Sequence, residues 1–184
     1  MQFRLQVELA CRQLSRLAFQ QEPAYVAALM GKLAGMQIQI GSSWLRTSVV
    51  NDRGPSSAES EFGADFAIVL ESTSGVSKAV LGQAKGSGID SLPQNQQDNF
   101  LRQCGLMAQK TKHFIGLEAP TGTNTMPIVR KGIWGPPLSI ESGRRLDDYL
   151  ADIFIACQHG DRRNGFVQAV KTSDLRQLRV LVAE

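Results

Sequence analysis

The sequence predicts an α/β or α+β domain in which helices flank a central mixed β-sheet. Two segments with helical spacing open the chain, a pair of closely spaced apolar segments follows, and helical and strand-like segments then alternate. This order is typical of helices packed on a sheet. The chain has 184 residues, 42% of them hydrophobic and 20% charged, which is the ordinary composition of a globular protein. Because this length suits one domain of usual size, we expect residues 1–184 to form a single domain.

The first fifty residues are expected to contain two helices and then two strands. Apolar residues recur at steps of three or four from Phe3 as far as Leu17, and a second such series begins at Val26 and ends at Leu33. Pro23 precedes the second series and is well placed in the first turn of its helix. Strands at 37–40 and 44–50 and turns at 41–43 and 51–57 are expected to follow.

The middle of the chain is expected to form a β-hairpin. Residues 65–71 contain the apolar run FAIVL, which is typical of a buried strand, and residues 78–85 form a second apolar segment. Residues 72–75 between them have turn chemistry, so the two strands are expected to pair. The glycine-rich segment 86–88 ends the second strand.

Helices and strands are expected to alternate in the second half. From Pro93 onward the apolar residues return to helical spacing, with Phe100, Cys104, Met107 and Thr111 on one face. The remaining expected elements are strands at 113–117, 126–129, 166–170 and 178–182, and a helix with Leu146, Leu150, Ile153 and Cys157 on its apolar face.

Charge, hydropathy and cysteine content exclude several classes of protein. Twenty Lys and Arg against 17 Asp and Glu give a net charge of +3, which permits an anionic partner without requiring one. No apolar run approaches the roughly 20 residues of a membrane span, and the polar N-terminus lacks the apolar core of a signal peptide. Cys11, Cys104 and Cys157 are far apart, odd in number and in no paired spacing, which argues against a disulfide framework and against a cysteine zinc site. We therefore expect a soluble, cytoplasmic protein with no membrane partner.

One segment of the chain is rich in acidic residues and lacks basic ones. Residues 54–77 contain Glu59, Glu61, Asp65 and Glu71 but no Lys or Arg. If Asp65 lies on the strand, Glu71 shares its face, because side chains alternate between the two faces of a strand. The same period brings Glu61 to that face, provided that the glycine between them does not break the strand.

The second strand of the hairpin would bring two more polar side chains to Asp65. Gln83 and Lys85 are two residues apart and therefore share a face. Oxygen ligands with open positions suit Mg²⁺, and here they would be the Asp65 carboxylate, the Gln83 side-chain oxygen and the backbone carbonyl of Ala84. Lys85 would orient or help deprotonate an attacking water and balance charge on a phosphate. In the alternative interpretation, these polar residues form the solvated end of a hairpin in an unrelated α+β domain.

The segments ESEFGADFAIVLE at 59–71 and KAVLGQAK at 78–85 resemble the PD-(D/E)XK nuclease superfamily. The match is to the Gln-x-Lys variant found in Mrr-like nucleases. It implies an α/β restriction-endonuclease-like fold, a central mixed β-sheet flanked by helices with an αβββαβ core, here at roughly 59–130. It also implies that the metal is bound by Asp65 and by Gln83, and that Lys85 serves the attacking water.

The function implied by the resemblance is a Mg²⁺-dependent (or Mn²⁺-dependent) endonuclease acting on DNA, with a role in restriction or anti-phage defence. Ala64 stands where the proline that names the superfamily is found, and Gln83 replaces an acid. The lost charge is expected to weaken metal binding unless another carboxylate contributes, with Glu61 ranked before Glu59 and Glu71. A homodimer is expected because many such nucleases pair subunits to cut two strands. The alternative is a non-catalytic nucleic-acid-binding or protein-interaction module on the same fold.

Basic and aromatic residues outside the motif are further candidates for ligand contacts. Lys110 and Lys112 end the helix that follows it, where cations complement the helix dipole and, on the nuclease fold, also reach DNA. Trp134 lies in a loop rich in Gly and Pro, where it either stacks on a ligand or anchors the loop. His113 and His159 have no partner at metal-ligand spacing and are assigned no catalytic role.

Overall fold

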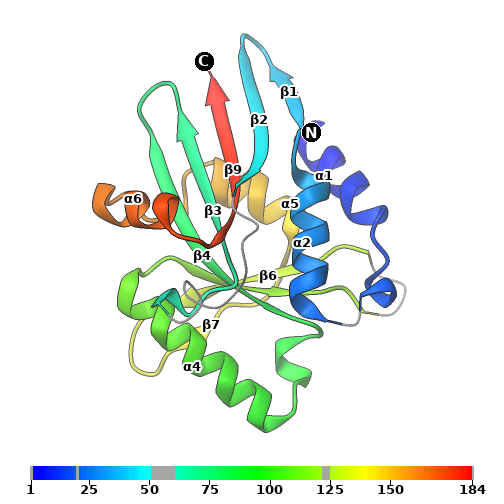
Figure 1. Cartoon of the computed structure of the whole chain (residues 1–184), viewed down its shortest axis with the longest axis vertical. Helices are drawn as coiled ribbons and strands as arrows, with labels where there is room; N and C mark the ends of the chain where they lie inside the picture. The colour runs from blue at the N-terminus through cyan, green and yellow to red at the C-terminus, as the bar shows by residue number, and fades with distance from the viewer. Residues whose placement is uncertain (1, 20, 51–60, 122–124, 184) are drawn as a thin grey trace.

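A mixed β-sheet forms the centre of the molecule, with helices on both faces (Figure 1). The computed structural model describes residues 2–19, 21–50, 61–121 and 125–183. The strands are β1 (Gln37–Ile40), β2 (Ser43–Val50), β3 (Phe66–Ser72), β4 (Ser77–Lys85), β5 (Phe114–Glu118), β6 (Ile128–Ile133), β7 (Ser139–Ile140), β8 (Arg144–Arg145) and β9 (Arg176–Ala183). The helices are α1 (Gln2–Arg12), α2 (Glu22–Leu33), α4 (Gln94–Lys110), α5 (Leu146–Asp148) and α6 (Asn164–Thr172), with the short 3₁₀ turns η1 (Arg16–Ala18) and η2 (Ile89–Ser91) and a π-helical segment, η3 (Tyr149–Ile155).

The predicted hairpin lies in the middle of this sheet. The strand order is β1-β2-β9-β3-β4-β5-β6-β7, with β8 beside β6. β3 and β4 are antiparallel, with register pairs running from Phe66 with Gly82 to Glu71 with Ser77. β4 then leads through α4 to β5, which runs parallel to it, while β9 is parallel to β3 on the other side. The predicted mixed sheet flanked by helices is therefore confirmed.

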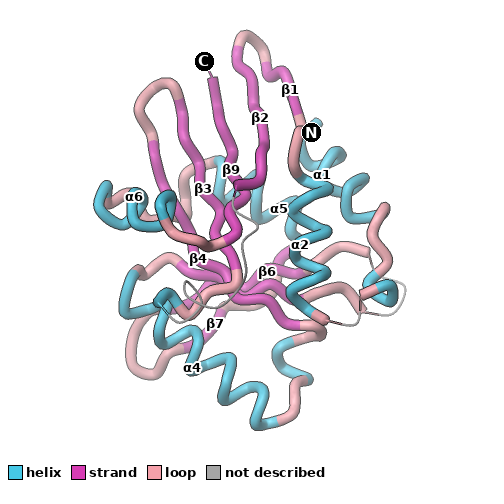
Figure 2. The backbone as a smooth tube through the Cα atoms, in the orientation of Figure 1, coloured by secondary structure: helices cyan, strands magenta, loops and turns pink. Residues whose placement is uncertain are grey.

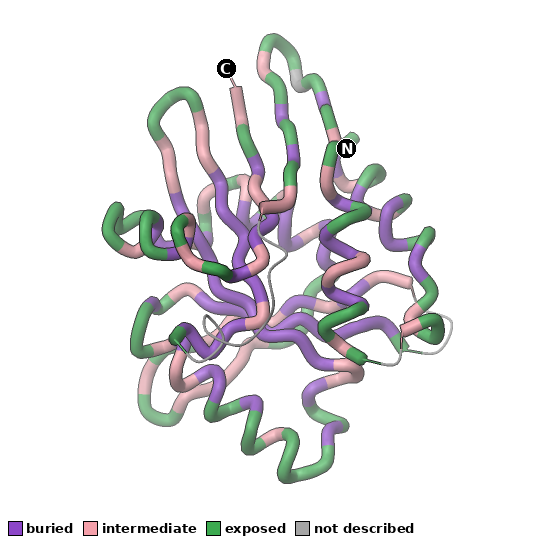
Figure 3. Tube along the Cα trace, in the orientation of Figure 1, coloured by how far each residue is buried: buried purple, intermediate pink, exposed green. Residues whose placement is uncertain are grey.

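Helices bury both faces of the central strands. On one face, α1, α2 and η3 contribute Val7, Tyr25 and Phe154 to the core. On the other face, α4 and α6 contribute Phe100 and Val167. The central strands are buried along most of their length, as Figure 3 shows, and Figure 2 shows the helices on either side of them.

Side chains of β3 alternate between these two cores as the sequence predicts. Phe66 and Ile68 pack on the side of α1 and α2, whereas Ala67 and Val69 pack on the side of α4 and α6. Leu81, the partner of Ala67 on β4, also lies on the α4 side. Polar residues that continue this parity along β4 must therefore lie between the sheet and α4.

One predicted strand is a helix. Residues 166–170 belong to α6, which buries Val167 and Val170. A short apolar run fits a strand or a helix equally well, and here the spacing of three between the two buried valines gives the helical face. Leu17 is a second correction: α1 ends at Arg12, and Leu17 lies in η1 with 90% of its surface exposed.

Within the described ranges, no helix combines the length and the apolarity that a membrane span requires. The expected turn at 51–57 lies outside the described residues.

Candidate active site

Asp65 and Gln83 meet where β3 begins and β4 approaches its end. Oδ2 of Asp65 accepts hydrogen bonds from Nε2 of Gln83 at 2.6 Å and from the backbone N–H of Ala84 at 2.8 Å. The backbone N–H of Asp65 donates to the carbonyl of Gly82 at 2.9 Å. Three consecutive residues of β4 therefore hold Asp65 in place, and Gln83 itself is only 2% exposed.

Lys85 lies two residues further along β4, beneath α4. Its side chain is 7% exposed, and Nζ donates to Oε1 of Gln103 at 3.2 Å and lies 5.8 Å from the ring centroid of Phe100. Gln103 is buried on α4, so the ammonium is enclosed between the helix and the sheet. By strand parity Lys85 is on the same face of β4 as Gln83, as the sequence predicts.

A glycine turn fixes how Asp65 enters the site. Gly63 has a φ of +67°, a conformation that favours glycine. A Cβ on Gly63 would lie 2.6 Å from Cβ of Leu106 and 2.8 Å from the carbonyl oxygen of Gln103, both in α4. The turn therefore packs directly against the helix that covers Lys85, and it delivers Asp65 to the first position before β3.

The additional carboxylates expected beside Asp65 are not placed there by the strand alternation. Glu61 is exposed in a helical turn, and Gly63 separates it from β3, so the parity used to place it beside Asp65 is wrong. Glu71 lies at the far end of β3, about 20 Å away at 3.3 Å per residue, and forms an ion pair of 2.5 Å with Lys171. Glu59 lies outside the described residues.

The donor set around Asp65 suits a weakly held, hard cation. Among the residues that the structure describes, the buried Oε1 of Gln83 has no hydrogen-bond partner, so within them one oxygen acceptor at the site is unsatisfied. The backbone N–H of Ala84, and not the expected carbonyl, contacts Asp65. The carbonyl of Ala84 points to the same side of β4 as this N–H, because both groups of a strand residue point to the same side. The described residues contain no group of three or more His, Cys, Asp or Glu able to hold a metal. One carboxylate and one amide oxygen match Mg²⁺, which keeps several waters and takes further ligands from substrate phosphate.

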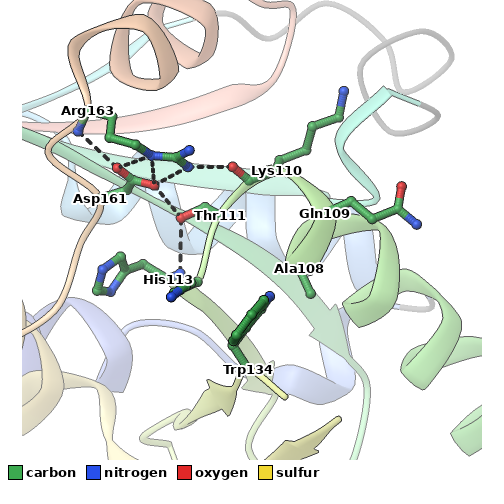
Figure 4. A pocket seen from close by; sticks show the side chains of 9 residues that line it. Ala108, Gln109, Lys110, Thr111, His113, Trp134, Asp161 and Arg163 are labelled. Carbon is green, nitrogen blue, oxygen red and sulfur yellow. Dashed lines mark hydrogen bonds and ion pairs between the residues drawn. The ribbon is translucent and has the colours of Figure 1, made fainter. Parts of the chain in front are cut away.

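A second polar cluster lies at the C-terminal end of α4 (Figure 4). Asp161 is buried there and accepts hydrogen bonds from Oγ1 of Thr111 at 2.7 Å and from the guanidinium of Arg163 at 2.6 Å. Burial alone would raise the pKa of Asp161, but the hydrogen bonds from Arg163 and Thr111 outweigh it and hold that pKa below its usual value. The same Arg163 donates to the carbonyl of Lys110 at 2.6 Å, so this cluster ties α4 to the segment before α6.

Both histidines of the chain adjoin this cluster, although their sequence spacing gave no sign of it. The ring centroids of His113 and His159 are 4.9 Å apart, and Nδ1 of His159 lies 2.8 Å from the hydroxyl of Tyr149. Burial, together with the nearby His113, Lys131 and Lys78, lowers the pKa of His159 to about 3. Burial likewise lowers the pKa of Lys78, which donates to the carbonyl of His159, to about 8.

Only the folded topology brings these residues together. Asp161 forms an isolated antiparallel bridge with Ala79, and this bridge draws the segment after η3 against β4. Pairs such as Thr111 and Asp161 are separated by 50 residues, so no local spacing could have indicated them. Comparison of the chain with family models, curated proteins and solved structures finds no match.

Proposed function

We propose that the chain is a Mg²⁺- or Mn²⁺-dependent endonuclease that hydrolyses phosphodiester bonds in DNA, with Asp65, Gln83 and Lys85 as its catalytic and metal-binding residues. The observation that carries this proposal is the contact of 2.6 Å between Oδ2 of Asp65 and Nε2 of Gln83, with the buried ammonium of Lys85 next on the same strand face. The restriction-endonuclease-like fold is part of the proposal. It is supported by the antiparallel pair β3–β4, the helix α4 and the parallel strand β5, in the order that the PD-(D/E)XK resemblance implies.

Each residue has a separate part in the proposed reaction. Mg²⁺ bound by the carboxylate of Asp65 and the side-chain oxygen of Gln83 would supply Lewis-acid polarisation of the phosphate. Lys85 orients the attacking water and balances the negative charge that develops on the phosphate in the transition state. The water oxygen bonds to phosphorus while the bond from phosphorus to the leaving oxygen breaks. The water gives up a proton to solvent and the leaving oxygen takes one up, so that the products are a phosphate monoester and a free hydroxyl group. α4 limits the access of bulk water to Lys85, which strengthens its interaction with the phosphate.

Metal-dependent cleavage of DNA by the unmodified protein tests this proposal. Supercoiled plasmid and linear duplex are incubated with the protein in Mg²⁺, in Mn²⁺ and in EDTA, and the products are separated on gels. We expect nicked or linear product in Mg²⁺ or Mn²⁺ and none in EDTA. If the folded protein leaves DNA intact with both cations, over a range of concentrations and pH, the nuclease proposal is wrong.

A second candidate function is a binding module without catalysis. One observation favours it: Asp65 already accepts hydrogen bonds from Gln83 and Ala84. These bonds can stabilise the contact between the start of β3 and the end of β4 without any metal. On this hypothesis, DNA binding persists in EDTA, and divalent cations change neither the melting temperature nor the DNA. The homodimer and the role in defence are further parts of the nuclease proposal, and they rest on the family resemblance.

Restoring the acid at position 83 is expected to strengthen metal binding. Gln83→Glu places a second carboxylate beside Asp65, and one extra negative charge near a divalent cation contributes about 1–2 kcal/mol, or roughly tenfold in affinity, at high dielectric. Without metal, the two carboxylates repel each other, so the melting temperature in EDTA should fall. Mg²⁺ titrations followed by thermal melting measure both effects. Gln168→Glu, an equal charge change at an exposed position of α6, is the control and should change neither the affinity nor the melting temperature. Equal behaviour of the two variants would contradict the metal site.

A further inference from the structure

The pocket at the C-terminal end of α4 has the size of a small-ligand site. Its volume is about 470 Å³, and its walls come from the end of α4, the segment between α4 and β5, the loop after β6 and the segment before α6 (Figure 4). Sites for small ligands occupy roughly 300–1,000 Å³. The pocket is therefore large enough for one nucleotide unit.

The charges that line this pocket favour an anion. Among the described residues that line it, Lys110, Lys112 and Arg163 contribute cations and Asp161 contributes one carboxylate. Asp161 is buried beneath the guanidinium of Arg163 and is already bonded to it, so these two charges compensate each other. The two lysines are both exposed and give the wall of the pocket a net positive charge, which suits a phosphate.

An exposed aromatic ring completes the pocket. Trp134 is 54% exposed, and Nζ of Lys112 lies 4.4 Å from the centroid of its ring. A cation this close to an indole indicates a site where positive charge and a flat apolar surface are presented together. Each nucleotide of a nucleic acid has a group suited to each of these: its base stacks on an aromatic ring, and its phosphate binds a cation.

One face of α4 connects this pocket to the proposed active site. Gln103 accepts the hydrogen bond from Lys85, Leu106 packs on Gly63, and Nζ of Lys110 lies 5.8 Å from the ring of Phe62. These helix positions are three and four residues apart and therefore share a face. Positions 103 and 110 are seven steps of 1.5 Å apart along the helix, about 10 Å, which is roughly three nucleotide steps of 3.4 Å along a stacked strand.

We propose that this pocket binds an unpaired nucleotide of a DNA strand, with its base stacked on Trp134 and its phosphate held by Lys110 and Lys112. The location of this nucleotide about three steps from the cleaved bond rests on the proposed nuclease function, whereas the binding itself does not require cleavage. A strand, and not a free nucleotide, is favoured because Lys110 also lies on the helix face that leads to Gly63.

Tryptophan fluorescence in EDTA tests the proposal without any cleavage. The chain has two tryptophans, so Trp44→Phe leaves Trp134 as the sole reporter. A single-stranded 12-mer is expected to quench that fluorescence, and the matching duplex and dAMP are expected to bind at least tenfold more weakly. If dAMP binds as tightly as the 12-mer, the pocket is a site for free nucleotides, and the proposal that it binds a DNA strand is wrong. A 12-mer that leaves the fluorescence unchanged would overturn the pocket itself.

Variants in the pocket provide an independent measurement, made by fluorescence anisotropy of a labelled 12-mer. Trp134→Ala is expected to weaken binding roughly 5- to 100-fold, the range found for loss of one base–aromatic stack, while Trp134→Phe retains most of it. Lys112→Glu should weaken binding as well. Lys32→Glu, the same charge change at an exposed position of α2 on the other face of the sheet, is the control. If Trp134→Ala and Lys112→Glu bind as Lys32→Glu does, the inference is wrong.

The failure of this inference and that of the nuclease proposal are distinguishable. A protein that never cleaves DNA but loses binding in Trp134→Ala supports the pocket and rejects the nuclease. A protein that cleaves DNA but binds the 12-mer equally well with and without Trp134 rejects the pocket alone.

Discussion

Lys85→Met is expected to lower the rate of metal-dependent DNA cleavage by about 10²–10⁴-fold, the usual contribution of a group that activates a nucleophile or balances transition-state charge. Methionine retains an unbranched apolar side chain in the enclosed space beneath α4 and removes only the ammonium. Asp65→Asn is expected to cause a loss of the same order. It retains an oxygen that can accept from the N–H of Ala84, but it removes the negative charge that would hold the cation. Initial rates on supercoiled plasmid, measured at saturating Mg²⁺, give both values.

The control for these variants is a second buried lysine of the same strand. Lys78 lies near the other end of β4, is fully buried and bonds to the carbonyls of Phe154 and His159. Lys78→Met should therefore reduce stability without reducing the cleavage rate per folded molecule, which a thermal melt recorded in the assay buffer makes measurable. Cleavage by Asp65→Asn or Lys85→Met at the rate of the unmodified protein would remove both residues from the mechanism.

The central hairpin could be predicted because its signals are local. The apolar run at 66–70 and the turn before β4 together specify two paired strands, and the strict alternation of strand side chains then assigns a face to each residue. That alternation directly predicts that Gln83 and Lys85 share one face of β4. The position of Asp65 is predicted because it immediately precedes Phe66. These three positions needed no knowledge of the rest of the molecule.

The parts that could not be predicted depend on distant contacts or on a single torsion angle. Gly63 adopts φ +67° against α4, which breaks the period that would have carried Glu61 onto the strand face. The orientation of the Gln83 amide depends on which atom meets Asp65, and a sequence does not specify it. His113 and His159 come from segments 46 positions apart, and they meet because Asp161 pairs with Ala79.

Acidification is expected to destabilise the protein from about pH 6.5 downward because His159 is buried in its neutral form. The side chain is 8% exposed, and the charged or titratable groups that act on it are His113, Lys131 and Lys78, all of which disfavour a further proton. Its pKa is about 3 in the folded protein and close to 6.5 in the unfolded chain, so the unfolded state binds the proton at intermediate pH. This contribution to stability is complete above pH 6.5 and is lost as the pH falls toward 3.

The expected slope is roughly 1.4 kcal/mol for each pH unit below 6.5, or about 2–3 kcal/mol between pH 6.5 and 4.5. His113, whose pKa is lowered mainly by burial, adds to the loss in the same direction. The pKa of Asp161 is held below its reference value of 3.8, so its contribution falls at lower pH and does not enter this window. Urea unfolding at pH 7.5, 6.5, 5.5 and 4.5 measures the slope directly.

His159→Asn separates this effect from general acid denaturation. Asparagine has no titratable group, and its amide can still bond to the hydroxyl of Tyr149, so the pH dependence should flatten even if stability at pH 7.5 falls. His113→Asn removes the only other histidine and should flatten the slope less, because His113 is the more exposed of the two rings. The slope, and not the stability at one pH, is the decisive quantity, since lost packing lowers stability at every pH by a similar amount. A slope in His159→Asn equal to that of the unmodified protein would show that His159 already carries its proton in the fold.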